Sequence, residues 1–214
     1  NGIHHSISAG NSGSRQNTIG GPAIAVYETD LVINGNVIGK VKRIKAIAAS
    51  DSDKKTANFS SRGPGSETTA GKPEQYKDYP LKPDESGVGV NLIAALPTGS
   101  NVPELGGPGG SMSGTSMSNP GVFGAFLLLT RGILVLLKDT LPVGPVAMQT
   151  RFALDLARYA MTKTGEKTGP AAEVGDGFIN VGAAFDLAAK LLKDNAPRTV
   201  LSRARSLLRG VFGF

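Results

Sequence analysis

The residues with the clearest chemical potential form one short stretch, Gly114-Thr115-Ser116-Met117-Ser118-Asn119-Pro120, which leads directly into an apolar run. A turn of small residues that ends in Ser and opens a buried helix exposes a nucleophilic hydroxyl. At the N-terminus of a helix, unpaired backbone N–H groups and the positive end of the macrodipole favour negative charge. The stretch therefore predicts Ser116 as a nucleophile placed where an oxyanion is stabilised. The alternative is a Gly/Ser-rich loop that only caps a buried helix.

Three segments of the chain resemble motifs of the subtilisin-like serine proteases (subtilases). Residues 114–120 are similar to the nucleophile motif of that family, Gly-Thr-Ser-Met-Ala/Ser-x-Pro. Residues 8–13 resemble its signature Ser-Ala-Gly-Asn-x-Gly, and residues 57–64 resemble its segment Ala-x-Phe-Ser-Ser-x-Gly-Pro. The resemblance implies a serine endopeptidase that hydrolyses peptide bonds with Ser116 as the nucleophile of a Ser-His-Asp triad. It also implies an α/β fold with a doubly wound parallel sheet.

In this resemblance, Asn11 takes the place of the Asn whose side chain donates a hydrogen bond to the oxyanion of the tetrahedral intermediate. A carboxamide suits that task because its NH₂ group donates without adding charge, and the end of a strand can aim it rigidly. The resemblance also implies substrate-binding residues in two segments, the second of which has glycines that leave a specificity pocket open: Ser8, Ala9, Gly10, Gly20 and Gly21. Without the resemblance, both segments would be interpreted as ordinary turns.

The chain offers no convincing general base for Ser116. In the family the order is Asp, His, Ser, and both partners lie upstream of the Asn signature, whereas only a short segment precedes Asn11 here. His4 and His5 lie on the strand that leads into Asn11, and we predict that they are structural. Four aspartates follow Asn11, so none can be the triad Asp by order, and they are predicted to be turn or cap residues: Asp30, Asp51, Asp53 and Asp84.

The triad Asp and His are therefore expected in a missing N-terminal half of the same domain. That half and a polypeptide substrate are the expected partners. Residues 1–193 are interpreted as the C-terminal part of the catalytic domain, and residues 194–214 as a basic tail. Alone, the chain is expected to be inactive and poorly stable, because half a parallel sheet leaves an open strand edge and an uncovered apolar helix. The resemblance implies a secreted or cell-surface location.

The composition fits one globular domain and argues against several classes of function. The 214 residues carry a net charge of +6 and no Cys, so neither a disulfide framework nor a thiolate metal site is expected. Basic residues gather at 40–45 and 198–209 without interleaved aromatics, so we expect a solvated basic face and no nucleic-acid partner. No Asp/Glu cluster has the spacing of calcium ligands, so no metal or other cofactor is expected.

Further elements follow from turn residues and hydrophobic periodicity. Asn34-Gly35 between two apolar runs predicts a β-hairpin within an insertion at 28–41, decorating the surface of the core fold. Strands are predicted at 3–9, 44–49 and 89–95, an exposed loop at 65–79, and helices at 122–137, 146–162 and 183–192. In the second helix, apolar residues at spacings of three and four are predicted core contacts: Met148, Phe152, Leu156 and Tyr159.

The helix after Ser116 is apolar all round and is predicted to be buried within the domain. If it begins a residue or so after Ser116, Pro120 falls in or near its first turn, where a missing N–H costs little. Its uncharged stretch before Arg131 is too short for a membrane span, so none is expected. A membrane-surface protein that uses this helix and the basic tail is a further alternative.

Residues 81–84 open a run similar to the family's Lys-Pro-Asp-Ile-Val-Ala-Pro-Gly-Val, but residues 85–88 depart from it. Glu85-Ser86-Gly87-Val88 stands where two apolar residues, Ala and Pro are usual. A charged Glu85 on a strand buried on both faces is costly unless it is paired. The departure keeps a second function open, a catalytically inactive subtilase-like module that serves as a binding or structural domain.

Overall fold

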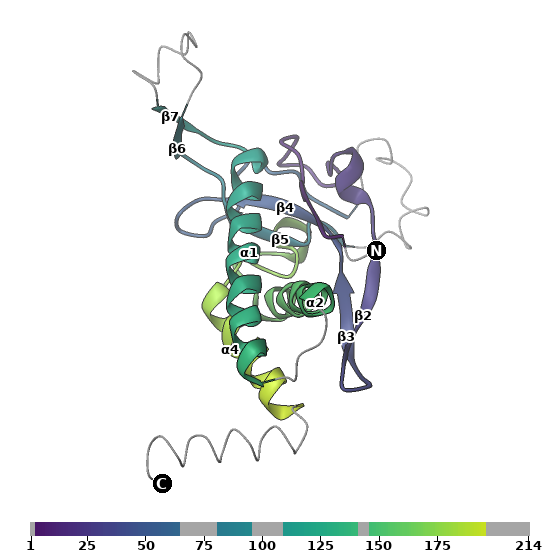
Figure 1. Ribbon diagram of the computed structural model, residues 1–214. Coiled ribbons are helices and arrows are strands. Elements are labelled where there is room, and N and C mark those ends of the chain that lie inside the picture. The colour runs from purple at the N-terminus through teal and green to yellow at the C-terminus, as the bar shows by residue number, and fades with distance from the viewer. Residues whose placement is uncertain (1–2, 65–80, 96–108, 141–145, 196–214) are drawn as a thin grey trace.

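The computed structural model describes residues 3–64, 81–95, 109–140 and 146–195 (Figure 1). The loop expected at 65–79 and almost all of the basic tail lie outside these residues. The described part is built from a small sheet, a long β-hairpin and several helices that pack against both. The predicted α/β class is confirmed by this arrangement.

A parallel three-stranded sheet forms the centre of the fold. Its strands are β1 (His5–Ser8), β4 (Ile44–Ser50) and β5 (Glu85–Val88), in the order β1-β4-β5. The register pairs His5 with Ile44, and Ile47 with Glu85. Strand β4 is central and almost wholly buried, as its run of small and apolar residues predicts. Strand β1 has no strand on its other side among the described residues.

A strand lies within the predicted range 89–95, but it is not the core strand that was predicted. The buried strand is β5, formed by the departing residues 85–88 themselves. Residues after it leave the sheet, and β6 (Leu92–Ala95) pairs antiparallel with β7 (Gly109–Met112) in an arm that projects away from the body (Figure 1). Ile93 is 85% exposed on this arm. Its apolar sequence resembled a core strand because composition alone does not show which ladder a strand joins.

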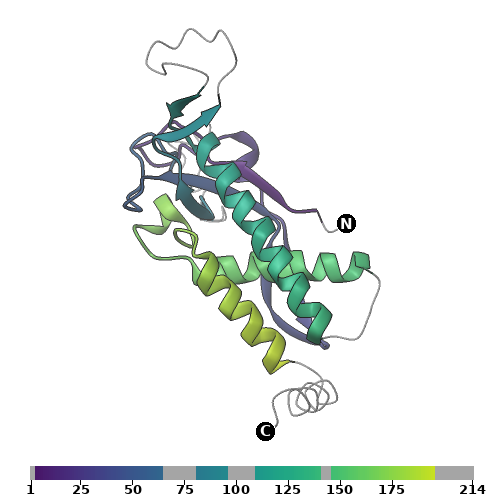
Figure 2. The ribbon, with the colours of Figure 1, turned by 60° about the vertical axis from the view of Figure 1, so that its left-hand side comes forward.

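Helices supply most of the core. They are α1 (Thr115–Thr140), α2 (Val146–Thr164), α3 (Ala171–Val174) and α4 (Val181–Asp194), with a short 3₁₀ turn η1 (Gly21–Ile24). Helices α1 and α4 run side by side, and α2 crosses them (Figure 2). The predicted helix at 146–162 is confirmed as α2, and Leu156 is fully buried in it. Met148, however, is 68% exposed, so it is not the core contact that was predicted.

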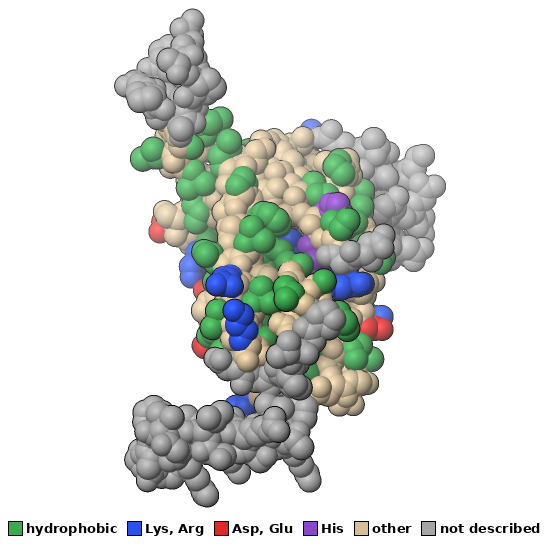
Figure 3. Space-filling view, in the orientation of Figure 1, with side chains coloured by type: hydrophobic (Ala, Val, Ile, Leu, Met, Phe, Trp, Pro, Cys, Tyr) green, Lys and Arg blue, Asp and Glu red, His purple; other side chains and the backbone are tan. Residues whose placement is uncertain are grey.

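Helix α1 is covered on one side only, which corrects the expectation of complete burial. Its inner face packs against β4, α2 and α4 through Val122, Phe126, Leu129, Ile133 and Leu137. On the other face Leu127, Leu128 and Val135 are exposed, and hydrophobic side chains are visible along the helix in Figure 3. By length and composition alone, residues 115–138 could also cross a membrane. The apolar character of α1 is therefore only partly explained by the packing within the described chain.

The predicted hairpin exists, but it is part of the core and not a surface decoration. Strands β2 (Glu28–Ile33) and β3 (Asn36–Lys42) pair antiparallel around Asn34 and Gly35, whose positive φ angles suit a tight turn. Leu31, Ile33 and Val41 are buried in the main hydrophobic cluster, and the hairpin packs against α2. The insertion thus covers α2.

The basic run at 40–45 is not the solvated face that was predicted. Only Lys40 lies on the surface, where it pairs with Asp30. Arg43 is buried and its Nη2 lies 2.7 Å from Asp155 Oδ2. Lys45 is fully buried and hydrogen-bonds to Glu85 and to Thr162. The acidic partners come from strands and helices far along the chain, which a local reading of charge does not show.

Buried ion pairs compensate the departure of β5 from an apolar pattern. The Glu85 side chain is 1% exposed and bonds to Lys45 Nζ, while Arg158 Nη1 lies 3.8 Å from Glu85 Oε2. The Arg158 guanidinium also stacks over the Phe126 ring, with Cζ 4.1 Å from its centroid. Burial lowers the pKa of Lys45, and the nearby Glu85 carboxylate opposes that effect. Each charge in this triad of Lys45, Glu85 and Arg158 therefore depends on the others.

Asp84 is also part of a buried network, and the prediction that it is a turn or cap residue is wrong. Its Oδ2 accepts hydrogen bonds from the Ala46 N–H at 2.7 Å and from Lys82 Nζ at 2.5 Å. Its Oδ1 lies 3.2 Å from Lys42 Nζ. Asp51, in contrast, accepts from the Lys55 N–H and is the turn residue that was predicted.

We expect Lys45→Met to destabilise the chain strongly, because it leaves Glu85 buried without its closest partner. Breaking a buried pair in this way costs about 3–5 kcal/mol. Replacing all three charges (Lys45→Met, Glu85→Val, Arg158→Met) is expected to restore most of that loss, since no charge then stays unpaired. Urea unfolding measures these free energies. Lys40→Met, in the exposed pair, is the matched control, and a Lys45→Met loss no larger than the control's would contradict the dependence.

Candidate active site

The motif at 114–120 forms the start of α1. The Gly114 N–H donates to the Gly89 carbonyl at 2.8 Å, and the Gly114 carbonyl accepts from the Met117 N–H at 3.0 Å. The helix therefore begins at Thr115, and Ser116 lies in its first turn with an exposed side chain. Pro120 lies in the second turn of the helix, just past the first turn in or near which it was expected. Because proline has no N–H, the Ser116 carbonyl lacks its usual helical donor.

The two predicted catalytic residues lie together although they are far apart in the sequence. Asn11 Oδ1 accepts hydrogen bonds from the Thr115 N–H at 2.9 Å and from Thr115 Oγ1 at 3.0 Å. Thr115 Oγ1 in turn accepts from the Gly10 N–H at 3.2 Å. Thr115 thus fixes the Asn11 carboxamide with its oxygen towards the helix and leaves Nδ2 as the outward donor.

Gly114 makes room for this arrangement. A Cβ atom built on Gly114 would lie 3.3 Å from Asn11 Nδ2 and 3.3 Å from Met117 Sδ. A side chain here would therefore crowd the face of the carboxamide that carries the free donor. The Ser116 N–H, as one of the first N–H groups of α1, has no acceptor within the helix. Two donors without an acceptor among the described residues, the Ser116 N–H and Asn11 Nδ2, thus lie on the same side of Gly114, 3.7 and 3.3 Å from the position of that Cβ atom.

The residues predicted to bind substrate gather around one bend beside Asn11. The Gly20 N–H donates to the Ala9 carbonyl at 2.8 Å, which joins the segments 8–10 and 20–21. Gly10 has a φ of +109°, a conformation that favours glycine. Gly21 is exposed, and a Cβ there would meet nothing within 4 Å. The bend is open at Gly21 and closed at Ala9, which is fully buried.

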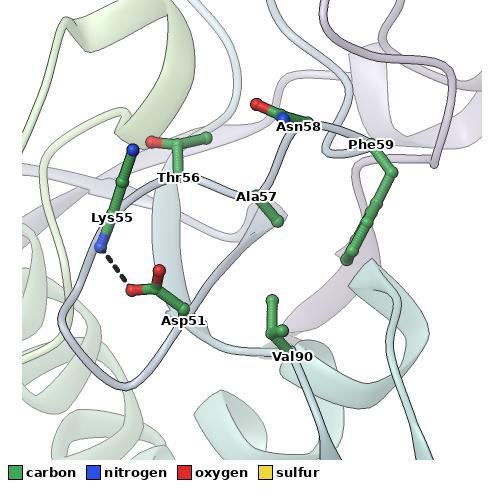
Figure 4. A pocket seen from close by; sticks show the side chains of 7 residues that line it. All are labelled: Asp51, Lys55, Thr56, Ala57, Asn58, Phe59 and Val90. Atoms are coloured by element: carbon green, nitrogen blue, oxygen red, sulfur yellow. Dashed lines mark hydrogen bonds between the residues drawn. The ribbon is translucent and has the colours of Figure 1, made fainter.

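A cavity of about 240 Å³ lies near the same end of the sheet (Figure 4). It is lined by Asp51, Lys55, Thr56, Ala57, Asn58, Phe59 and Val90. In Figure 4 the side chains of Ala57, Phe59 and Val90 point towards one another. The Phe59 carbonyl accepts from the Gly13 N–H, and Val90 follows the Gly89 that binds Gly114. The cavity is therefore next to the two segments that carry Asn11 and Ser116.

Neither histidine is placed to act on Ser116. The His4 side chain is 2% exposed, and its Nε2 lies 3.0 Å from Asp155 Oδ1. Its ring packs 5.6 Å from the Phe126 ring, centroid to centroid. Phe126 lies almost three turns along α1 from Ser116, or roughly 15 Å at about 1.5 Å per residue. His5 is exposed on β1.

Other side chains near Ser116 do not supply a base either. Among the described residues, no imidazole, carboxylate or amine forms a hydrogen bond with the Ser116 hydroxyl, and no three His, Asp or Glu side chains gather as metal ligands would. The described residues thus place an exposed hydroxyl near two N–H donors, and none of them supplies a general base beside that hydroxyl.

Two residues of the motif have contacts that the sequence analysis missed. Ser118 Oγ donates to the Ala48 carbonyl at 2.7 Å and so joins α1 to β4. The Asn119 carboxamide bonds to Ser6 on β1 through both of its ends. Both are small polar residues at the start of an apolar helix, and that contrast is the signal in the sequence that marks them.

Comparison with known proteins supports the resemblance found in the sequence. No family model matches the chain. The subtilisin-like protease SBT3.9 of Arabidopsis thaliana is 38% identical over 92 residues, which are 43% of this chain and 11% of that protein. The fold is similar to a mutant of the protease domain of PatA, with a TM-score of 0.50 and 19% identity, over 86% of this chain and 47% of that domain. Both comparisons support the predicted resemblance to the C-terminal region of a subtilase. The chain spans about half of the PatA protease domain and a smaller share of SBT3.9.

We expect His4 to make stability fall in mild acid. Burial lowers the pKa of His4 below its usual 6.5, and the Asp155 hydrogen bond only partly opposes this. The unfolded chain then binds the proton more readily, so the free energy of unfolding decreases as the pH falls below about 6.5. Urea unfolding between pH 5 and 7 measures the slope. His4→Gln should flatten it and the exposed-site control His5→Gln should not; an unchanged slope in His4→Gln refutes the assignment.

Proposed function

We propose that this chain is the C-terminal part of the catalytic domain of a subtilisin-like serine endopeptidase, in which Ser116 is the nucleophile. The observation that carries the proposal is the hydrogen bonding of Asn11 Oδ1 to Thr115, the residue before Ser116. Two segments about half the chain apart thus bring a hydroxyl and a carboxamide to one place, as acyl transfer requires. The sequence match and the fold support the same family.

The proposed reaction begins with attack of Ser116 Oγ on the carbonyl carbon of a peptide bond. The negative charge that develops on the carbonyl oxygen is stabilised by the Ser116 N–H and by Asn11 Nδ2. The amine product leaves with the proton that the base took from Ser116, and water then hydrolyses the acyl-enzyme. Helix α1 adds the positive end of its dipole to the same oxyanion site.

The base and its orienting Asp are proposed to lie upstream in a longer polypeptide. His4 is committed to Asp155, and His5 is at an exposed position of β1. Two features of the described chain suit a covering segment: the unpaired edge of β1 and the exposed apolar face of α1 at Phe123, Leu127 and Leu128. Docking the missing half there would bury both and complete the triad.

The proposed substrate is a polypeptide, bound along Ser8, Ala9 and Gly10 and with a side chain directed past Gly20 and Gly21. The open bend at Gly21 leaves space for a sizeable side chain. The family relationship supports a secreted or cell-surface protein. An inactive subtilase-like binding module is the second candidate, because β5 departs from the family pattern; the pairing of Glu85 explains that departure without disturbing Ser116.

Labelling with a fluorophosphonate probe tests the proposal. The described chain alone is expected to stay unlabelled because it has no base for Ser116, whereas the full-length polypeptide is expected to be labelled. Ser116→Ala should abolish that labelling. Stoichiometric labelling of Ser116 in the 214-residue chain alone would show that a base is present within it. A full-length protein that folds but is not labelled would favour the inactive module.

Asn11→Ala is expected to slow peptide hydrolysis by the full-length protein through kcat with little change in KM, because the donor acts only on the oxyanion. A loss of about 100- to 1,000-fold is the value known for the oxyanion-hole Asn of subtilisin itself. The control is Asn36→Ala, an exposed Asn on the hairpin. An Asn11→Ala enzyme with unchanged kcat would remove Asn11 from the mechanism.

A further inference from the structure

We propose that Asn119 is a positioning residue: together with Ser6, it fixes the rotation of the first turns of α1 so that the Ser116 N–H and Asn11 Nδ2 converge on one oxyanion. This inference rests on the proposed role of Ser116 as a nucleophile. The family motif quoted above leaves the residue before the proline undefined, so the family resemblance does not account for Asn119.

Both ends of the Asn119 carboxamide are engaged by one residue of β1. Nδ2 donates to the Ser6 carbonyl at 3.1 Å, and Oδ1 accepts from Ser6 Oγ at 2.6 Å. A side chain bonded at two points to the same partner has a defined orientation, unlike one bonded at a single point. The pair, which we call the Asn119–Ser6 clamp, therefore fixes α1 in rotation as well as in distance.

The clamp bonds to the Ser6 carbonyl, which takes no part in the hydrogen bonds between β1 and β4. The His5 and Ala9 N–H groups donate to carbonyls of residues 43 and 47 on or next to β4. Because polar backbone groups alternate sides along a strand, those of Ser6 point to the opposite edge of β1. Asn119 thus satisfies a carbonyl on the unpaired edge, and the clamp adds to the sheet bonds without replacing any of them.

The clamp and the Asn11–Thr115 contact join the same two segments on either side of Ser116. Ser116 and Asn119 are three residues apart on α1 and therefore share a face. Ser6 and Asn11 lie on one short segment, and Asn11 is bonded to Thr115. Without the clamp, the segment that carries Asn11 is still hydrogen-bonded to α1 at Thr115. Helix α1 could then rotate about Thr115, and the Ser116 N–H and Asn11 Nδ2 would no longer point at the same oxyanion.

The consequence belongs to catalysis more than to folding. Helix α1 is held to the sheet independently by Ser118 Oγ on the Ala48 carbonyl and by the Gly114 N–H on the Gly89 carbonyl. Its inner apolar face adds the packing against β4, α2 and α4. The fold therefore survives loss of the clamp, while a shift of about 1 Å in a reacting group is enough to lower a rate about 100-fold.

The experiment measures peptide hydrolysis by the full-length protein. Asn119→Ala and Ser6→Ala are each expected to lower kcat by about 10- to 100-fold with KM changed less than about twofold. Ser6→Thr keeps the hydroxyl donor and should remain near the wild-type rate. Thr130→Val is the matched control, since it removes a buried α1 hydroxyl whose partner among the described residues is the Phe126 carbonyl of its own helix.

A second background separates positioning from general damage. If the clamp acts through alignment with Asn11, Asn119→Ala should lower kcat by less than about twofold once Asn11 is already Ala. An equal loss in both backgrounds would overturn the inference, as would a wild-type kcat in Asn119→Ala.

Hydrogen exchange keeps the test independent of activity. In Asn119→Ala, which lacks the clamp, the Thr115 amide that is bonded to Asn11 should exchange about tenfold faster than in the wild type. In Thr130→Val its exchange rate should be unchanged. If the wild-type protein shows no hydrolysis, the proposed function fails and this measurement still decides the clamp. Unaltered exchange at Thr115 would overturn it.

Discussion

The first turns of α1 are anchored to the rest of the chain residue by residue, and the proposed chemistry depends on that anchoring. The four anchors bind three segments, at or next to β1, β4 and β5, through the pairs Gly114–Gly89, Thr115–Asn11, Ser118–Ala48 and Asn119–Ser6. Ser116 lies between them with an exposed side chain. A nucleophile has to be accessible and yet fixed, and neighbours that carry the anchoring meet both demands.

The core beneath this site departs from the simple rule that buried strands are apolar. Strand β5 carries Glu85, and the cost of its burial is offset by Lys45 from the neighbouring strand and Arg158 from α2. Strands β4 and β5 and helix α2 each contribute one charge to this triad, so another arrangement of these elements would leave a buried charge unpaired. Glu85 Oε1 bonds to Lys45, whereas Glu85 Oε2 and the Arg158 guanidinium are buried in ion-pair contact without a hydrogen-bond partner among the described residues.

The features that depend on residues close together in the sequence, such as turns and helices, were predicted correctly. The Asn34-Gly35 hairpin, the helices, and the meeting of Asn11 with the Ser116 segment all follow from turn chemistry, periodicity and motif. The buried lysine and arginine of the basic run could not be predicted, because their acidic partners lie on other elements. The core strand was assigned to 89–95 for a related reason: Ile93 and its neighbours are apolar, but the partner that decides burial is the strand they pair with.

Pro120 makes the turn that carries Ser116 differ from an ordinary helix start. With no N–H at that position, the peptide carbonyl of Ser116 is left out of the helical ladder. Contacts with other segments therefore support this turn in addition to its own helical bonds, among them Thr115 with Asn11 and Ser118 with Ala48. Because the partners of these contacts lie on or next to β1, β4 and β5, the backbone conformation at Ser116 is coupled to the packing of all three strands.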